Sequence, residues 1–116
     1  MDGELAIGKK YQQLKNNNII MATTVISCFE LWQWDGLNAK EEQRLRDFLK
    51  TMIIRPFTQR EAEIAGEIQK SLKKKGLEIQ SEDSMIAGIA LAQQEPLLTR
   101  NVKHFERIPG LRVETY

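Results

Sequence analysis

The sequence has few of the features that mark secreted or membrane proteins. It contains one cysteine, Cys28, which excludes an intrachain disulfide framework and agrees with a reducing compartment. No apolar run approaches the roughly 20 residues that a transmembrane helix needs. The first five residues, MDGEL, lack the basic and apolar regions of a secretory signal. We therefore expect a cytoplasmic protein.

The sequence also lacks a dominant charge. Seventeen basic and sixteen acidic residues leave a net charge of +1, so bulk electrostatics does not favour nucleic-acid binding. Any such binding must come from a local patch. A length of 116 residues with 41% hydrophobic content suits a globular protein with one core. We predict a single domain over residues 1–116.

Apolar, largely β-branched runs alternate with segments of helical spacing. The runs predict four strands, at about residues 19–25, 52–57, 97–99 and 111–115. The helical spacing predicts helices near residues 5–15, after Ser27, over 39–51, from Thr58 to Lys75, from Ser81 to the stop at Pro96, and a turn or short helix over 102–108. Ser81 is the candidate N-cap of the helix that stops at Pro96. Strands separated by helices favour right-handed crossovers and a mainly parallel α/β sheet covered on both faces.

A hydroxyl residue followed three positions later by glutamate marks two of the helix starts. Ser27-x-x-Glu30 and Thr58-x-x-Glu61 both have the spacing of a capping box. By position alone, Glu30 is most simply explained as the capping partner of Ser27. Asp83 is likewise explained as a negative charge in the first turn of a helix.

A second interpretation groups three polar residues at the carboxyl edge of the sheet. Glu30 follows the first strand, Asp83 opens the helix after Ser81, and Asn101 follows the strand at 97–99. Mg²⁺ and Mn²⁺ prefer such oxygen ligands, and a bound ion activates water and stabilises charge on a phosphodiester. Spacing alone leaves the capping and the metal interpretations open.

Five segments in order resemble the PIN-domain ribonucleases that form the toxin subunit of VapBC toxin–antitoxin pairs. They are residues 22–31 (ATTVISCFEL), 61–68 (EAEIAGEI), 83–90 (DSMIAGIA), 98–105 (LTRNVKHF) and 108–113 (IPGLRV). The resemblance covers nearly the whole chain. It implies a PIN-like three-layer α/β/α fold with a mainly parallel sheet.

The resemblance further implies a Mg²⁺- or Mn²⁺-dependent endoribonuclease. Glu30 and Asp83 match acids that hold the metal in this family, and Asn101 falls where the family has Asp or Asn. His104 stands where many members have a further acid. We predict Glu30, Asp83 and Asn101 as catalytic residues and Glu30 and Asp83 as metal ligands. Arg100 and His104 are the candidates for binding the RNA substrate.

The resemblance does not extend to the first strand of the family. PIN domains of this type open with a strand that ends in an aspartate and lies in the middle of the sheet, between the strands predicted at 19–25 and 97–99. The present sequence shows no such strand. Closure of the two half-sheets, a strand exchanged between protomers, or an upstream start would repair the gap. Because the leading carboxylate is lost as well, we expect little or no cleavage.

The resemblance also implies two protein partners. A small antitoxin is received by the helical hairpin that contains Trp32 and Trp34, one of which we expect to be an exposed anchor, and a second copy would form a homodimer. The alternative is a non-catalytic remnant that keeps the antitoxin groove or the dimer face. A third interpretation is an α/β domain whose acids only cap helices.

Overall fold

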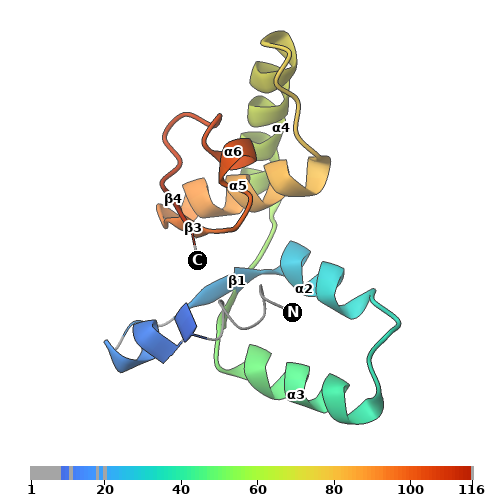
Figure 1. Cartoon of the computed structure of the whole chain (residues 1–116). Coiled ribbons are helices and arrows are strands. Elements are labelled where there is room, and N and C mark those ends of the chain that lie inside the picture. Colours follow the sequence, from blue (N-terminus) through green and yellow to red (C-terminus); the bar gives the residue numbers. More distant parts are fainter. Residues whose placement is uncertain (1–8, 11, 18, 20, 116) are drawn as a thin grey trace. The chain divides into compact units, whose positions relative to one another are not determined.

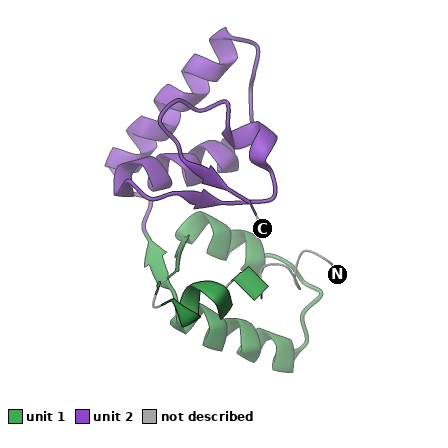
Figure 2. Ribbon diagram, turned by 60° about the vertical axis from the view of Figure 1, so that its left-hand side comes forward, with its two compact units in different colours: residues 1–55 green, residues 56–116 purple. Residues whose placement is uncertain are grey.

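The computed structural model describes residues 9–10, 12–17, 19 and 21–115. The chain divides into two compact units, residues 1–55 and residues 56–116, coloured separately in Figure 2. Each unit is described by itself. The helix predicted near 5–15 lies partly outside the described residues, of which 9–10 and 12–16 are helical. The single domain over 1–116 stays a prediction.

Unit 1 contains a parallel pair of strands joined through two helices (Figure 1). Its elements are β1 (Ala22–Thr24), α2 (Val25–Trp32), α3 (Ala39–Lys50) and β2 (Ile53–Arg55). Thr23 of β1 is in register with Ile54 of β2, and the Ile53 N–H donates to the carbonyl of Met21 at 3.1 Å. Parallel pairing through a helical connection is the arrangement that the sequence predicted, although both strands are shorter.

The start of α2 differs from the prediction. Thr24 is the N-cap, and its Oγ1 accepts a hydrogen bond from the Ser27 N–H at 3.0 Å. Thr24 has the extended backbone of a strand end (φ −111°, ψ 157°), which lets its hydroxyl reach the first turn. The prediction that Ser27 caps this helix is therefore wrong. Glu30 lies a full turn inside α2 and is not the partner of a Ser27 capping box.

The start of α3 has a capping box that was not predicted from the sequence. The Glu41 N–H donates to Oδ1 of Asn38 at 2.8 Å, and the Asn38 N–H donates to the Glu41 carboxylate at 3.2 Å. Asparagine is as good an N-cap as serine. The motif Asn-x-x-Glu therefore carries the same signal as the two hydroxyl motifs.

Unit 2 contains three helices and a second parallel pair of strands. Its elements are α4 (Gln59–Lys74), α5 (Ser81–Gln93), β3 (Leu97–Leu98), α6 (Val102–Phe105) and β4 (Val113–Glu114). Leu97 is in register with Val113, and the Leu97 N–H donates to the Arg112 carbonyl at 2.8 Å. All four predicted strands are thus present and both pairings are parallel. In the described residues they form two separate pairs.

The helix boundaries of unit 2 follow the predicted signals with one correction. Thr58 caps α4 as predicted: its N–H donates to the Glu61 carboxylate at 3.0 Å and its hydroxyl donates to the same oxygen. Ser81 is the first residue of α5 rather than its cap, because the extended residue before it is Gln80. The helix ends at Gln94, which has the left-handed backbone (φ 55°) that often terminates helices.

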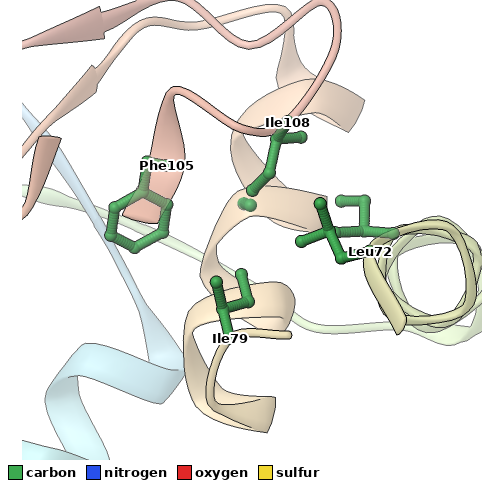
Figure 3. Packing of buried hydrophobic residues seen from close by; sticks show 6 residues of the cluster. Leu72, Ile79, Phe105 and Ile108 are labelled. Atoms are coloured by element: carbon green, nitrogen blue, oxygen red, sulfur yellow. The ribbon is translucent and has the colours of Figure 1, made fainter. Parts of the chain in front are cut away.

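The hydrophobic core of the described residues lies in unit 2. Figure 3 shows Leu72 of α4, Ile79, Phe105 of α6 and Ile108 pointing toward one another. Leu72 is 1% exposed, and the fully buried Ala87 of α5 belongs to the same cluster. None of the helices in the described part of the chain combines the length and apolar character needed to cross a membrane.

Helices α4 and α5 approach most closely at Gly88. A Cβ placed on Gly88 would lie 3.0 Å from the backbone oxygen of Glu61 and 3.1 Å from the backbone nitrogen of Ala65. These atoms belong to the first turns of α4 and cannot move without shifting the helix. Gly66, on α4, faces open space instead, and a Cβ added there would meet nothing within 4 Å. Glycine is thus required sterically at 88 and not at 66.

We predict opposite effects for the two glycine-to-alanine substitutions. Gly88→Ala should lower the free energy of unfolding by about 1–3 kcal/mol because the added methyl overpacks the helix crossing. Gly66→Ala should raise it by roughly 0.5–1 kcal/mol because alanine loses less backbone entropy in a helix. Urea unfolding of both variants measures this. Equal effects at the two positions would contradict the crossing geometry.

The Thr58–Glu61 cap predicts a pH-dependent contribution to stability. Hydrogen bonding from the Thr58 hydroxyl, with help from backbone N–H groups, lowers the pKa of Glu61. A carboxyl group with a lowered folded-state pKa stabilises the fold above its ordinary pKa of about 4.3, and the stabilisation disappears as the pH falls through the folded-state value. Thr58→Ala should cost about 1 kcal/mol at pH 7, the usual cost of losing an N-cap.

The control for this prediction is Thr58→Ala made in a protein that also carries Glu61→Gln. The stability deficit of Thr58→Ala should shrink between pH 7 and pH 2, and this pH dependence should be absent when Glu61 is also replaced by glutamine. Thermal unfolding of the single and double variants across this range is the measurement. A deficit that is the same at every pH would show that the hydroxyl does not act through the carboxylate.

Candidate functional site

Glu30 lies on an exposed position of α2 in unit 1. The strand β1 leads directly into this helix, so Glu30 follows the carboxyl end of a parallel strand as predicted. Because Thr24 is the N-cap of α2, Glu30 is not the capping-box partner of Ser27. A role in metal or substrate binding stays a prediction for Glu30.

Asp83 lies in the first turn of α5 in unit 2, half-buried. Burial raises the pKa of its carboxyl group, the charge of nearby His104 lowers it, and Glu82 raises it again. Glu82 shares the same helical turn but is exposed. Partial burial of a carboxylate is unfavourable unless a cation or donor compensates it. Of the two acids, Asp83 is therefore the one whose surroundings favour a positively charged partner.

Asn101 and His104 form a hydrogen-bonded pair beside this acid. The Asn101 side-chain nitrogen Nδ2 lies 2.7 Å from Nδ1 of His104. The backbone reinforces the pair, since the Asn101 N–H donates to the Thr99 hydroxyl at 3.0 Å and the His104 N–H donates to the Asn101 carbonyl at 3.2 Å. Asn101 is the N-cap residue of α6 and His104 lies inside this helix, so the two side chains meet across its first turn.

The structure thus places the predicted site residues in two groups. Asp83, Asn101 and His104 belong together in unit 2, and the exposed Arg100 directly precedes Asn101. Glu30 belongs to unit 1. Within the described residues, no group of three or more His, Cys, Asp or Glu side chains is arranged to hold a metal ion.

This donor set is short of a complete metal site. Asp83 supplies one carboxylate and His104 one imidazole, whereas a hard cation such as Mg²⁺ is held by oxygen ligands. Unit 2 therefore supplies one of the two carboxylates that the resemblance implies for the Mg²⁺ or Mn²⁺ site, and the other, Glu30, belongs to unit 1. The pairing of Asn101 with His104 was missed in the sequence, although the i, i+3 spacing is a visible signal for contact across one helical turn.

Both tryptophans of unit 1 are exposed, whereas one exposed anchor was expected from the sequence. No residue of α2 or α3 is buried, and three aromatic side chains stand out: Phe29 is 63% exposed, Trp34 58% and Trp32 37%. Trp34 lies over Gly36, where a Cβ would come within 2.7 Å of the indole, and the guanidinium of Arg46 sits 5.1 Å from the Trp32 ring centre. We call Phe29, Leu31, Trp32 and Trp34 the aromatic surface of unit 1.

Comparison with known proteins places this fold in a family. Residues 5–111 match the family described as PIN domain. Ribonuclease VapC2 of Rickettsia felis is 35% identical over 105 residues, which cover 88% of this chain and 77% of the relative. The VapBC2 complex of Rickettsia felis, solved on a DNA fragment from its promoter, matches 93% of this chain and 84% of its own, with a TM-score of 0.80 and 29% identity.

A second solved complex gives the same result. DNA-bound VapBC of Salmonella typhimurium matches 90% of this chain and 82% of its own, with a TM-score of 0.81 and 27% identity. These matches confirm the α/β PIN-like fold predicted from the five sequence segments. The chain belongs to the PIN-domain family, and within it to the group of the VapC ribonucleases.

Proposed function

We propose that this chain is the toxin subunit of a VapBC-type toxin–antitoxin pair and that it acts on RNA phosphodiester bonds. The observation that carries the proposal is the family match over residues 5–111, together with a relative of 35% identity that is named a ribonuclease. The partly buried Asp83, next to the Asn101–His104 pair, gives the proposed reaction a local centre.

We further propose roles for the individual residues. Glu30 and Asp83 bind a divalent cation, which the family resemblance suggests is Mg²⁺ or Mn²⁺ and which would activate a water molecule. Asn101 is a supporting metal ligand or orients the water molecule, and Arg100 and His104 contact RNA phosphate. Because the described residues do not supply a three-ligand cluster, we propose that cleavage by the isolated chain is weak.

Acid-to-amide substitutions test the nuclease proposal. Glu30→Gln and Asp83→Asn should each lower cleavage of a total-RNA substrate by at least about tenfold, the smaller end of the losses caused by disturbing a metal site. Glu82→Gln is the matched control, because Glu82 is an exposed acid in the same turn as Asp83. Cleavage is measured in Mg²⁺ and in Mn²⁺. Equal activity in all three variants would contradict the assigned roles.

The aromatic surface of unit 1 favours a second candidate function, binding of an antitoxin without catalysis. Soluble proteins seldom expose several neighbouring aromatic side chains unless a partner covers them. Two of the structural matches are VapBC complexes, and VapBC is a family of toxin–antitoxin systems. We propose that the antitoxin covers this surface in the present protein. Homodimer formation stays a prediction.

Truncation of the most exposed tryptophan tests the binding proposal. Trp34→Ala should weaken binding to a VapB-type antitoxin by about 30-fold, the effect expected for a residue contributing about 2 kcal/mol at an interface. Leu77→Ala is the control, since Leu77 is a similarly exposed apolar residue of unit 2 (39%). Isothermal titration calorimetry gives both affinities. Equal weakening by the two substitutions would exclude a specific role for Trp34.

If the wild-type chain binds the antitoxin but cleaves no RNA under any metal condition, the non-catalytic alternative holds. In that case the acid-to-amide variants should bind as tightly as the wild type. This result would separate the binding function from the nuclease function in one set of proteins.

A further inference from the structure

Four of the seventeen basic residues of the chain lie within six positions of unit 2. They are Lys70, Lys73, Lys74 and Lys75, which we call the lysine patch. No acidic residue lies between them, so thirteen basic and sixteen acidic residues remain in the rest of the chain. All four side chains are exposed at the C-terminal end of α4. A chain with almost no net charge therefore carries a concentrated positive charge at one place.

Little of this positive charge is neutralised by neighbouring acids. Lys70, Lys73 and Lys74 are three and four residues apart, so they are neighbours on one side of the helix. Glu67 pairs with Lys70 at 2.7 Å and lies within the electrostatic reach of Lys74. Within the described part of the chain, Lys73 and Lys75 form no ion pair. One acid thus faces two of the four lysines.

The end of α4 is closed by backbone hydrogen bonds rather than by lysine side chains. The Leu77 N–H donates to the Leu72 carbonyl at 2.8 Å, and the Gly76 N–H donates to the Lys73 carbonyl at 3.1 Å. These are the two bonds of a Schellman motif, and Gly76 has the positive φ (69°) that the motif requires. Leu72 is itself buried in the core, so the last turn is fixed. The lysine ammonium groups are therefore free of a capping role and are held on a rigid support.

The phosphate backbone of a nucleic acid fits such a patch. Lysine binds phosphate as a point charge, and contacts to successive phosphates position a nucleic acid without reading its bases. We propose that the lysine patch binds the phosphate backbone of RNA and holds the substrate outside the site around Asp83. The inference rests on the proposed function for the identity of the nucleic acid.

The chain length between the patch and Asp83 suits one RNA strand. Eight residues separate Lys75 from Asp83, so their Cα atoms are at most about 28 Å apart. About ten nucleotides cover that distance at roughly 3.4 Å for each phosphate of a strand. The same strand can therefore contact both places.

RNA binding measured without cleavage tests the proposal. The full chain is titrated in EDTA into a fluorescein-labelled single-stranded RNA of about 16 nucleotides, and anisotropy gives the affinity at several salt concentrations. The patch variant and its control each replace three exposed lysines by glutamine, at Lys73, Lys74 and Lys75 or at Lys9, Lys40 and Lys50 of unit 1. A third protein carries arginine at the three patch positions. Because a cation in a last helical turn also complements the helix dipole, thermal unfolding of each protein confirms that it is folded during binding.

We expect the patch variant to bind RNA at least about tenfold more weakly than the wild type at about 50 mM salt. The slope of log affinity against log salt should fall in magnitude by about 2, because each phosphate contact on a single strand contributes about 0.7. The control variant and the arginine variant should each stay within about twofold of the wild type, since the first keeps the patch and the second keeps its charge.

Three results would overturn the proposal. Equal weakening by the patch and control variants would assign the binding to total charge, and a wild-type chain that does not bind the RNA would remove it altogether. A patch variant that binds RNA normally but loses affinity for a VapB-type antitoxin would make the patch a protein-binding surface. None of these results measures cleavage, so the nuclease proposal can stand when the patch fails. Conversely, patch-dependent RNA binding by a chain that cleaves no RNA would support the patch and overturn the nuclease proposal.

Discussion

The close crossing of α4 and α5 at Gly88 is the contact on which the rest of unit 2 depends. Gly88 lets the backbone of α5 touch the first turns of α4 at Glu61 and Ala65. Asp83 stands five residues earlier on the same helix, about 7.5 Å along its axis. The crossing therefore sets where the carboxylate lies relative to the core. A functional group on a rigid, packed helix is held more accurately than one on a loop.

Unit 1 differs from unit 2 in how much of its apolar surface is buried. Its described helices bury no residue completely, and its largest side chains are exposed. Covering them would contribute roughly 25 cal/mol per Å² of apolar surface. A partner that binds only the folded form stabilises that form by mass action. A partner that covered the aromatic surface would therefore couple its binding to the folding of α2 and α3.

Much of this fold could be predicted from local sequence signals. The four strands, the parallel pairing and the Thr58–Glu61 cap follow from β-branched runs and capping spacing. The errors at Ser27 and Ser81 share one cause: in each case the residue with extended backbone precedes the predicted cap. At Thr24 the extended residue is the last of β1, and where a strand ends is decided by pairing with a distant segment, which local spacing does not contain. The correction at Ser27 changes the meaning of Glu30, whose simplest structural explanation is gone.

The candidate site departs from the pattern of the family resemblance at His104, where a further acid was expected. The resemblance suggested oxygen ligands for Mg²⁺ or Mn²⁺, and topology alone brings Asp83 and Asn101 to one sheet edge. What the sequence could not give is the geometry by which Asn101 holds the His104 ring next to Asp83. The i, i+3 spacing accounts for the contact of Asn101 with His104. The approach of Asp83 depends instead on the packing of α5 and α6 in the core, where Ala87 and Phe105 belong to one cluster.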